Sequence, residues 1–520
     1  MDTRARLSLA ALLCLLPLVP LSLRLSWLQI VRHERFLQRA AAETGGQDLE
    51  IIPRGIIVDR RGRVLAQSQP VWSAFLDLPA EPEAARKAVR GAAAMLGLEP
   101  EGLLAQAKPG RRFLWLKRKL TAQESAKVRA GRLATVGLAP EEARVYPNGD
   151  LGRSLFGAVD SDGNGTAGLE LTFNSKLRGR SRKIRLVRDG SGRTMPADPV
   201  SEEGEAPAEL RLTLDRSAQY FAEVELREAV LRHKAKKGIV LVQEPRSGDL
   251  LAAAVYPPDP RRNAALQDVF EPGSTFKIVA AAAVLEGGIF APTDTLDCEG
   301  GRWALTPSVT LKDHEPEGVI TLAEVIERSS NIGTAKLALR VGAKNFHRHC
   351  RTFGFGYKTG LPLPGESAGL LPAHSALNPV RLANAGFGQG VAVTAIQLIS
   401  AFSALANGGS LMEPRLILAV GGEPAPGPVR LRRVASEKTV AQLGSILEGV
   451  VLRGTGQSAR LAGYRAAGKT GTAQKIDPAT GRYSASDYLS SFIGYAPLPD
   501  PRFTILVAID SPRVGYYGSE

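Results

Sequence analysis

The sequence is poor in the residues that build metal centres and disulfide frameworks. Its 520 residues include three cysteines and six histidines. Cys14 lies in an apolar run, and Cys298 and Cys350 are far apart without a CxxC pattern. A zinc site needs clustered Cys and His, and the histidines show no such spacing, so we expect no metal and no cofactor. We interpret Cys298 and Cys350 as single buried thiols, with pairing in an oxidising compartment as the alternative.

The sequence also lacks a concentrated basic region and a repeat of 20–50 residues. The net charge of +14 suits an anionic membrane surface, an anionic cell-wall polymer or nucleic acid. The basic residues are scattered, however, and no aromatic residues interleave with a basic run. We therefore expect no nucleic-acid partner. The hydrophobic share of 44% is typical of a globular protein, and the length allows two or three domains.

One long uncharged apolar run occurs at the amino terminus. It covers residues 7–23 and resumes after Arg24 up to Val31, which predicts a transmembrane anchor over residues 7–31. Arg4 and Arg6 precede the run, so residues 1–6 are predicted to be cytoplasmic and the rest to be exported. A cleaved signal peptide is the alternative, but no small-x-small site closes the run. The expected location is the inner (cytoplasmic) membrane, single-pass, with an extracytoplasmic carboxyl-terminal part.

A break rich in Pro and Glu, residues 196–207, divides the exported part into two predicted domains, 45–205 and 206–520. In the first domain, residues 81–95 and 121–130 have helical patterns. The second begins with a helical stretch over 217–233 and a strand hairpin over 238–243 and 249–256. A mostly helical middle and two strand-like runs, 488–495 and 502–510, follow. Strands at both ends with helices between them predict an α+β fold, with one antiparallel sheet flanked by helices.

Ser274 and Lys277 lie three residues apart, after a Pro-Gly turn and at the start of an apolar run that predicts a buried helix. On a helix both side chains share one face. A serine hydroxyl needs a base, and lysine is a base only when neutral. Burial and a second cation must therefore lower the lysine pKa by about three units. The helix start also offers backbone N–H groups to an oxyanion. This spacing alone is common, and a capping serine beside a surface lysine is the alternative.

Two further motifs strengthen the catalytic interpretation. Ser329-Ser330-Asn331 follows in a helical context, and Lys469-Thr470-Gly471-Thr472 follows before the strand-like end. The combination of S-x-x-K, Ser-x-Asn and K-T-G is associated with penicillin-binding proteins and serine β-lactamases.

Other candidates near the motifs are interpreted as structural. Lys358-Thr359-Gly360 also spells K-T-G, but it follows a Gly-rich loop between helices, so we assign the site to Lys469. His314 is interpreted as a structural or surface residue, and Glu271 as a carboxylate at a helix start.

With these motifs in order, the chain resembles class B penicillin-binding proteins, most closely the cell-division (septal) peptidoglycan D,D-transpeptidases. The resemblance implies a penicillin-binding/β-lactamase-like transpeptidase domain preceded by an elongated pedestal (dimerisation-type) domain and one transmembrane helix. Further segments that carry it are Arg54-Gly55-Ile56-Ile57-Val58-Asp59, Tyr146-Pro147, Gly165-Thr166-Ala167-Gly168-Leu169-Glu170 and Phe387-Gly388-Gln389-Gly390.

The resemblance also implies roles for the motif residues. Ser274 would attack the penultimate D-Ala carbonyl of a stem peptide, and Lys277 would take its proton. Ser329 would bridge toward Lys469, a fixed cation, and Asn331 would hold Lys277 and the substrate amide. The binding residues for the substrate carboxylate would be Thr470, Gly471 and Thr472, and the N–H groups of Ser274 and Thr472 would form the oxyanion hole.

Expected partners are peptidoglycan stem peptides (a D-Ala-D-Ala donor and an amine acceptor), β-lactams, the membrane, a polytopic SEDS-family glycosyltransferase and other division proteins. The resemblance would also place a helix after Tyr516-Tyr517-Gly518, where this sequence stops at Glu520. Three alternatives to a septal transpeptidase remain: a D,D-carboxypeptidase or other penicillin-recognising hydrolase, a side-wall elongation transpeptidase, and a scaffold with a decayed site.

Overall fold

The computed structural model describes residues 16, 18–36, 45–50, 52–108, 110–131, 133–178, 182–188, 194–199, 206–476, 480–515 and 518. The chain divides into two compact units. The first comprises Met1–Ile52 and Gly179–Ala206, and the second comprises Pro53–Arg178 and Pro207–Glu520.

In the first unit, the described part of the predicted anchor is helical. Helix α2 (Leu18–Ser26) continues as a π-helical turn, Trp27–Val31, and none of its side chains is buried. The guanidinium groups of Arg24 and Arg32 lie 4.6 and 4.1 Å from the centre of the Trp27 ring. No helix among the described residues is long and apolar enough to cross a membrane. Residues 7–15 and Pro17 of the predicted span lie outside the described residues.

The same unit contains a three-stranded antiparallel sheet. Its order is β1 (Gly45–Glu50), β8 (Arg182–Arg188) and β9 (Thr194–Pro199).

The second unit contains a seven-stranded sheet that joins segments far apart in the sequence. Strand β10 (Leu210–Leu212) pairs parallel to β2 (Ile57–Val58) and antiparallel to β18 (Ile417–Val420). The sheet therefore includes strands from both sides of the predicted boundary at 205/206. Its other strands are β3 (Val64–Asp77), β4 (Phe113–Leu120), β5 (Val136–Val145) and β19 (Glu423–Pro424). The two helices predicted in this part are α4 (Pro82–Leu96) and α6 (Ala122–Gly131), and α5 (Pro100–Gln106) lies between them.

A buried ion cluster anchors the start of β2. The fully buried carboxylate of Glu170, in α8 (Gly168–Thr172), accepts from Arg54 Nε at 2.6 Å and from Arg144 Nε at 2.7 Å. A buried carboxylate needs such partners, because its desolvation is otherwise very costly. The cluster thus joins α8, β5 and the chain that enters β2.

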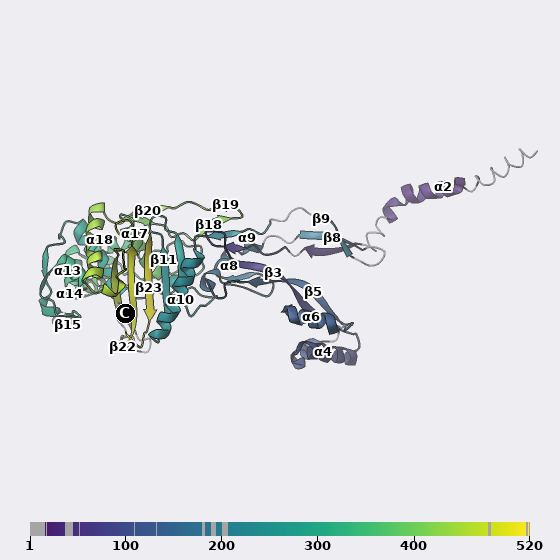
Figure 1. Ribbon diagram of the computed structural model, residues 1–520, viewed down its shortest axis with the longest axis horizontal. Helices are drawn as coiled ribbons and strands as arrows, with labels where there is room; N and C mark the ends of the chain where they lie inside the picture. Colours follow the sequence, from purple (N-terminus) through teal and green to yellow (C-terminus); the bar gives the residue numbers. More distant parts are fainter. Residues whose placement is uncertain are drawn as a thin grey trace, which may run out of the picture. The chain divides into compact units, whose positions relative to one another are not determined.

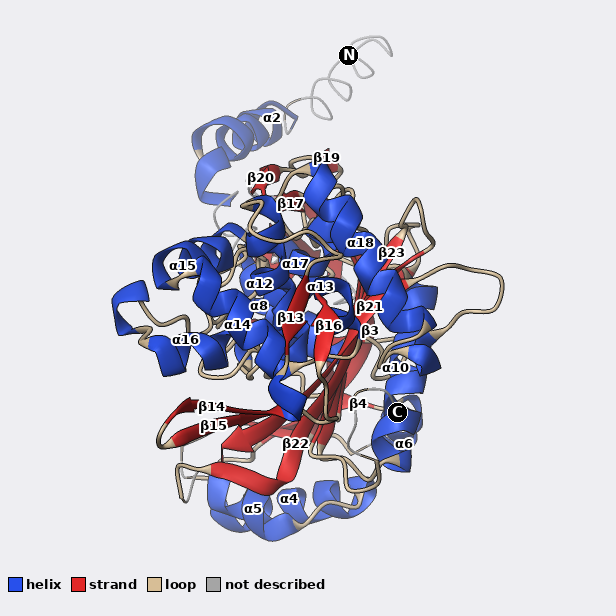
Figure 2. Ribbon diagram, turned by 90° about the vertical axis from the view of Figure 1, so that its left-hand side faces the viewer, coloured by secondary structure: helices blue, strands red, loops and turns tan. Residues whose placement is uncertain are grey.

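A five-stranded antiparallel sheet forms the framework of the carboxyl-terminal part, as the α+β prediction requires (Figure 2). Its order is β12 (Leu250–Tyr256), β11 (Lys237–Gln243), β23 (Phe503–Asp510), β22 (Tyr483–Ala496) and β21 (Ala467–Ile476). The predicted hairpin is β11–β12, and the two predicted carboxyl-terminal strands are β22 and β23.

Helices cover both faces of this sheet (Figure 1). Helix α10 (Arg216–Arg232) packs on β12 and β11, where Val240 and Ala252 contact it within one cluster. Helix α17 (Ala395–Ala406) packs on β11, β22 and β23 from the other side. Alternate residues of each strand point to opposite faces of the sheet, and helices cover both faces. Each strand is therefore apolar on both sides.

Helix α12 (Lys277–Glu286) runs through the core, and every residue from Lys277 to Leu285 is buried. A helix that is apolar all round is stable only when it is buried on all sides, which explains the Ala- and Val-rich run. The remaining elements of this unit are α7 (Arg153–Phe156), α9 (Asn174–Arg178), α11 (Ala264–Gln267), α13 (Leu322–Glu327), α14 (Asn331–Val341), α15 (Ala343–Thr352), α16 (Pro379–Gly386), α18 (Glu437–Leu452), β6 (Ala158–Val159), β7 (Gly165–Ala167), β13 (Thr295–Asp297), β14 (Arg302–Thr306), β15 (Val309–Lys312), β16 (Val319–Thr321), β17 (Ser410–Met412) and β20 (Arg430–Arg433), with short 3₁₀ turns.

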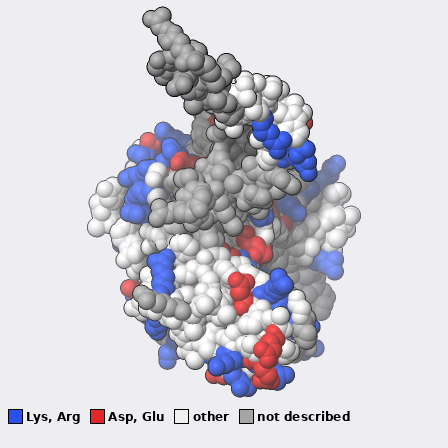
Figure 3. Space-filling model, turned by 90° about the vertical axis from the view of Figure 1, so that its right-hand side faces the viewer, with Lys and Arg blue, Asp and Glu red and all other residues white. Residues whose placement is uncertain are grey.

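Side-chain placement bears on two sequence predictions. Cys298 and Cys350 are both buried and unpaired with each other, so the single-thiol interpretation is confirmed. On the face shown in Figure 3, basic and acidic side chains are interspersed rather than gathered by sign.

Candidate active site

Ser274 lies in a 3₁₀ turn, Gly273–Phe276, that leads directly into α12. The predicted buried helix begins at Lys277, so Ser274 lies in the turn that precedes the helix. Side chains three apart eclipse one another in 3₁₀ geometry, so Ser274 and Lys277 still lie on one side. Ser274 is half-buried, whereas Lys277 has no exposed surface.

The turn depends on close approaches that the sequence did not reveal. Gly273 has φ 54°, and its N–H donates to the carbonyl oxygen of Gly388 at 3.2 Å. A Cβ on Gly388 would lie 2.2 Å from the Gly273 oxygen, so a side chain there is excluded. A Cβ on Gly471 would lie 2.9 Å from Thr275 Cγ2, which explains how β21 reaches the nucleophile turn. Gly388 and Gly471 both belong to segments quoted from the sequence, but the close contacts that require glycine at these positions are visible only in the fold.

Two buried lysines meet at one serine. Lys277 Nζ donates to Ser329 Oγ at 3.1 Å and to the Ser329 carbonyl oxygen at 2.5 Å. Lys469 Nζ donates to the same Oγ at 3.0 Å. The structure therefore brings Lys277, Ser329 and Lys469 together, although they belong to α12, the α13–α14 turn and β21.

The surroundings of the two lysines favour their neutral forms. Burial, together with the charge of Lys469, holds the pKa of Lys277 well below its usual range, against a smaller opposing effect of Asp313. Burial lowers the pKa of Lys469 to about 7. The predicted fixed cation therefore loses its proton more readily than an exposed lysine does. A lowered pKa is the electrostatic condition for a lysine that acts as a general base.

Asn331 begins α14, beside Ser329, but its side chain has another partner than the predicted one. Its Nδ2 donates to the Lys312 carbonyl oxygen at 3.1 Å. In the described part of the chain it forms no hydrogen bond to Lys277. Its backbone N–H donates to Asp313 Oδ1, and Asp313, which lies beside His314, was not among the predicted site residues.

The residues after Lys469 line the edge strand of the sheet. Thr470 is buried, and its hydroxyl is 2.7 Å from that of Thr455. Thr472 Oγ1 accepts from the N–H of Gly518 at 3.1 Å. Among the described strands β21 pairs only with β22, so it is the edge strand of the sheet, the position at which an extended peptide can add to a sheet.

The second K-T-G sequence has no place in this site. Lys358 is exposed, and Thr359 donates from both its N–H and its hydroxyl to Glu366 Oε1. The carboxylate of Glu366 also accepts from Gly360 N–H at 3.1 Å. This second copy of K-T-G is therefore a loop held in place by the Glu366 carboxylate.

The two other candidates also differ in placement. His314 is exposed. Glu271 does not cap the nucleophile turn: its Oε1 accepts from Gly390 N–H at 2.8 Å and from the Tyr483 hydroxyl at 3.1 Å. Its Oε2 is buried without a hydrogen-bond partner, and burial raises the pKa of this carboxyl. Glu271 thus ties the β21–β22 hairpin to the 387–390 segment.

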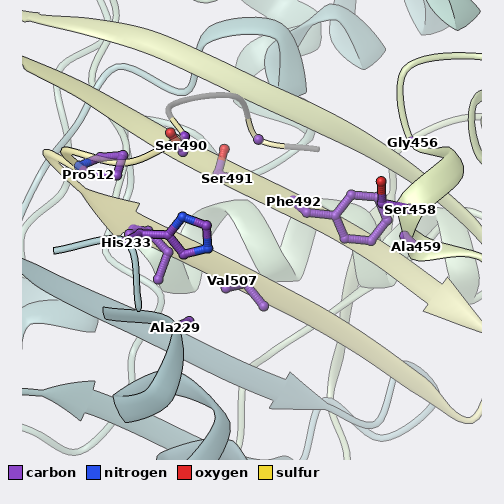
Figure 4. A pocket seen from close by; sticks show the side chains of 13 residues that line it. Ala229, His233, Gly456, Ser458, Ala459, Ser490, Ser491, Phe492, Val507 and Pro512 are labelled. Atoms are coloured by element: carbon purple, nitrogen blue, oxygen red, sulfur yellow. The ribbon is translucent and has the colours of Figure 1, made fainter. Parts of the chain in front are cut away.

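A cavity of about 260 Å³ lies elsewhere in this unit, on the face of the sheet that α10 covers (Figure 4). His233, Phe492 and Val507 line it, and none of the predicted catalytic residues does. Among the described residues no group of three or more His, Cys, Asp and Glu side chains is placed to hold a metal ion.

Comparison with known proteins accounts for both parts of the chain. The penicillin-binding protein dimerisation domain matches residues 51–207, and the penicillin-binding protein transpeptidase domain matches residues 238–520.

Relatives align along nearly the whole chain. Probable peptidoglycan D,D-transpeptidase PbpC of Pseudomonas aeruginosa is 35% identical over 99% of this chain and 92% of its own length. Peptidoglycan D,D-transpeptidase FtsI of Escherichia coli is 31% identical over 98% of this chain and 88% of its own. The crystal structure of penicillin binding protein 3 from Mycobacterium tuberculosis with aztreonam shares 29% identity and a TM-score of 0.71, covering 91% of this chain and 93% of that one. Both domains, in this order, place the chain in the class B penicillin-binding proteins.

Proposed function

We propose that this protein is a peptidoglycan D,D-transpeptidase that cross-links stem peptides through an acyl-enzyme on Ser274. The observation that carries the proposal is the convergence of two buried lysines on Ser329 Oγ, one of which, Lys277, lies three residues after Ser274. A neutral lysine in such a site activates a hydroxyl nucleophile. The D,D-transpeptidase names of the relatives support the same activity.

In the acylation step, Ser274 Oγ attacks the carbonyl carbon of the penultimate D-Ala, and Lys277 accepts the hydroxyl proton. The tetrahedral intermediate collapses as the C–N bond breaks, and the leaving D-Ala nitrogen receives a proton through Ser329. Backbone N–H groups of Ser274 and Thr472 stabilise the oxyanion. An acceptor amine then attacks the ester carbon, which forms the cross-link and restores the Ser274 hydroxyl. A β-lactam acylates Ser274 by ring opening, and its leaving group stays attached.

Lys469, Thr470, Gly471 and Thr472 bind the substrate carboxylate along β21. Burial lowers the pKa of Lys469 in the free site, and an anion beside it favours its charged form. Binding of the substrate carboxylate therefore promotes protonation of Lys469. The charge on Lys469 in turn disfavours a proton on Lys277. Asn331, at the start of α14, offers its side-chain oxygen to the substrate amide while its Nδ2 donates to the Lys312 carbonyl oxygen.

The chain context supports a role at the membrane. We infer an uncleaved anchor over residues 7–31, a pedestal domain over 45–205 and a transpeptidase domain over 206–520. The exposed apolar side chains of α2, followed by Trp27 between two arginines, suit a membrane interface. Because neither matched domain is a glycosyltransferase, we propose a SEDS-family polymerase as partner, and septal synthesis as the setting. Imaging of the protein in dividing cells tests the septal role.

Labelling of the full-length protein by a fluorescent penicillin tests the chemistry. Wild type and Ser308→Ala, a change of an exposed serine in the β14–β15 turn, are expected to label equally, and Ser274→Ala is not expected to label. Labelling of Ser274→Ala would refute the nucleophile. A D-Ala-D-Ala donor given with an acceptor amine should yield the cross-linked product, whereas hydrolysis alone would show a carboxypeptidase.

A further inference from the structure

Asp313 directly follows β15 and reaches the turn that carries Ser329 and Asn331. Its Oδ1 accepts from the N–H groups of Asn331 and Ile332, at 2.5 and 2.9 Å. Its Oδ2 accepts from the Ser330 hydroxyl at 2.6 Å. A carboxylate that receives free N–H groups at a helix start stabilises that start. One side chain from the β14–β15 hairpin thus satisfies three donors of the Ser-x-Asn segment.

The segment needs such support because its conformation is unfavourable. Ser329 has φ 64°, a left-handed conformation that is strained in a residue with a Cβ. Strained backbone of this kind persists when the surrounding contacts hold it in place. Here the strain directs both oxygens of Ser329 to Lys277. If the turn relaxed, the oxygen that joins the two lysines would move.

We propose that Asp313 is a positioning residue, which holds Ser329 and Asn331 in the geometry that acylation of Ser274 requires. This inference rests on the proposed function. The β14–β15 hairpin lies outside the three motifs, and through Asp313 it would affect the rate of acylation.

Asp313 also carries a charge that Lys277 experiences. The groups that face Lys277 are Lys469 from β21, Asp313 from the end of β15 and the Cys298 thiol, and the Asp313 charge favours the protonated lysine. Geometry and charge therefore act in opposite directions on acylation. An asparagine at this position separates them, because its amide oxygen still accepts from both N–H groups while the charge is lost. The Ser330 hydroxyl can then donate to Cys298 Sγ, 3.3 Å away.

The test is the second-order rate of acylation by a fluorescent penicillin, measured from pH 5 to pH 9 on full-length protein. We expect Asp313→Ala to lower the plateau rate at least tenfold. Asp313→Asn should keep the plateau rate within about threefold. The acidic limb, where the rate falls as the pH is lowered, should move to lower pH, since Lys277 loses its proton more readily. Glu315→Gln removes a charge from an exposed residue of the same loop and should change neither the plateau nor the limb.

Each outcome has one meaning. If wild type does not label, the proposed function fails, whatever Asp313 does. If wild type labels and Asp313→Ala matches it in both plateau rate and limb, the inference is overturned. Equal losses in Asp313→Ala and Asp313→Asn, without a shifted limb, overturn it as well. Thermal unfolding of each variant shows whether it folds. If Asp313→Ala does not fold, the position of the acidic limb in the folded Asp313→Asn protein tests the inference.

Discussion

Lys277 and Lys469 share one hydrogen-bond acceptor, the Ser329 hydroxyl oxygen, at 3.1 and 3.0 Å. A hydroxyl oxygen has two lone pairs, and the two lysines occupy both. The Ser329 hydroxyl can then still donate its own proton, as the proposed mechanism requires of it. The same arrangement places two ammonium groups close together in a dry environment, which makes their protonation mutually unfavourable.

The first prediction concerns the charge of Lys469. In Lys469→Gln the repulsion that disfavours a proton on Lys277 is lost, so the pKa of Lys277 rises. The acidic limb of the acylation profile should move to higher pH, and the plateau should fall because the carboxylate loses its cation. Acylation rates across pH measure both effects.

Lys358→Gln is the matched control, because it alters the exposed lysine of the second K-T-G sequence. Its profile should coincide with that of wild type. A displaced limb in Lys358→Gln, or an unmoved limb in Lys469→Gln, would contradict the assignment of the site to β21.

The second prediction separates activity from stability at Ser329. Both Ser329→Ala and Ser329→Gly remove the bridging hydroxyl and should lower acylation about 100-fold, the scale of a lost proton-transfer group. Glycine adopts φ 64° without strain, whereas alanine does not. The free energy of unfolding of Ser329→Gly should exceed that of Ser329→Ala by about 1 kcal/mol. Equal unfolding midpoints in denaturant would show that Ser329 is unstrained.

The sequence predicted the parts of this site that repeat in pattern or follow each other locally. Two apolar runs joined by a Pro/Gly turn identified β11–β12, and the order of three motifs identified Ser274, Lys277, Ser329 and Lys469. What it missed depends on contacts between distant segments. Nothing local in the sequence shows that β10 and β18 join the sheet of β2, or that Asp313 reaches α14. Likewise the partner of Asn331 Nδ2 is a backbone oxygen, which no residue pattern encodes.

The third prediction tests the close approach of the 387–390 segment to the nucleophile turn. Gly388→Ala places a Cβ 2.2 Å from the Gly273 carbonyl oxygen and also strains a residue at φ 84°. We expect acylation to fall at least tenfold, because the turn must shift with Ser274 on it. Gly390→Ala is the control, since Gly390 has a similar φ of 74° but no atom within 4 Å of the added Cβ. Equal losses in the two variants would show that backbone strain, not the approach to Gly273, causes the effect.

The last prediction uses the burial of Lys469 as a source of pH-dependent stability. Its pKa is about 7 in the folded protein, against a usual value of 10.5. Between these values the unfolded chain holds a proton that the folded protein has released, so the free energy of unfolding rises with pH. The penalty for burying the charged lysine is complete below pH 7 and is relieved as the pH approaches 10.5. Between pH 7 and pH 9 the gain is about 2 kcal/mol.

Lys469→Met removes this titration and fills a similar volume, so its melting temperature should rise less between pH 7 and pH 9 than that of wild type. Lys277 acts in the same direction and remains in the variant, which leaves a smaller slope rather than none. Lys358→Met, at an exposed position, should keep the wild-type slope. Differential scanning calorimetry across this range measures the difference. Parallel curves for wild type and Lys469→Met would mean that Lys469 stays charged in the free site, and that its cation does not depend on substrate.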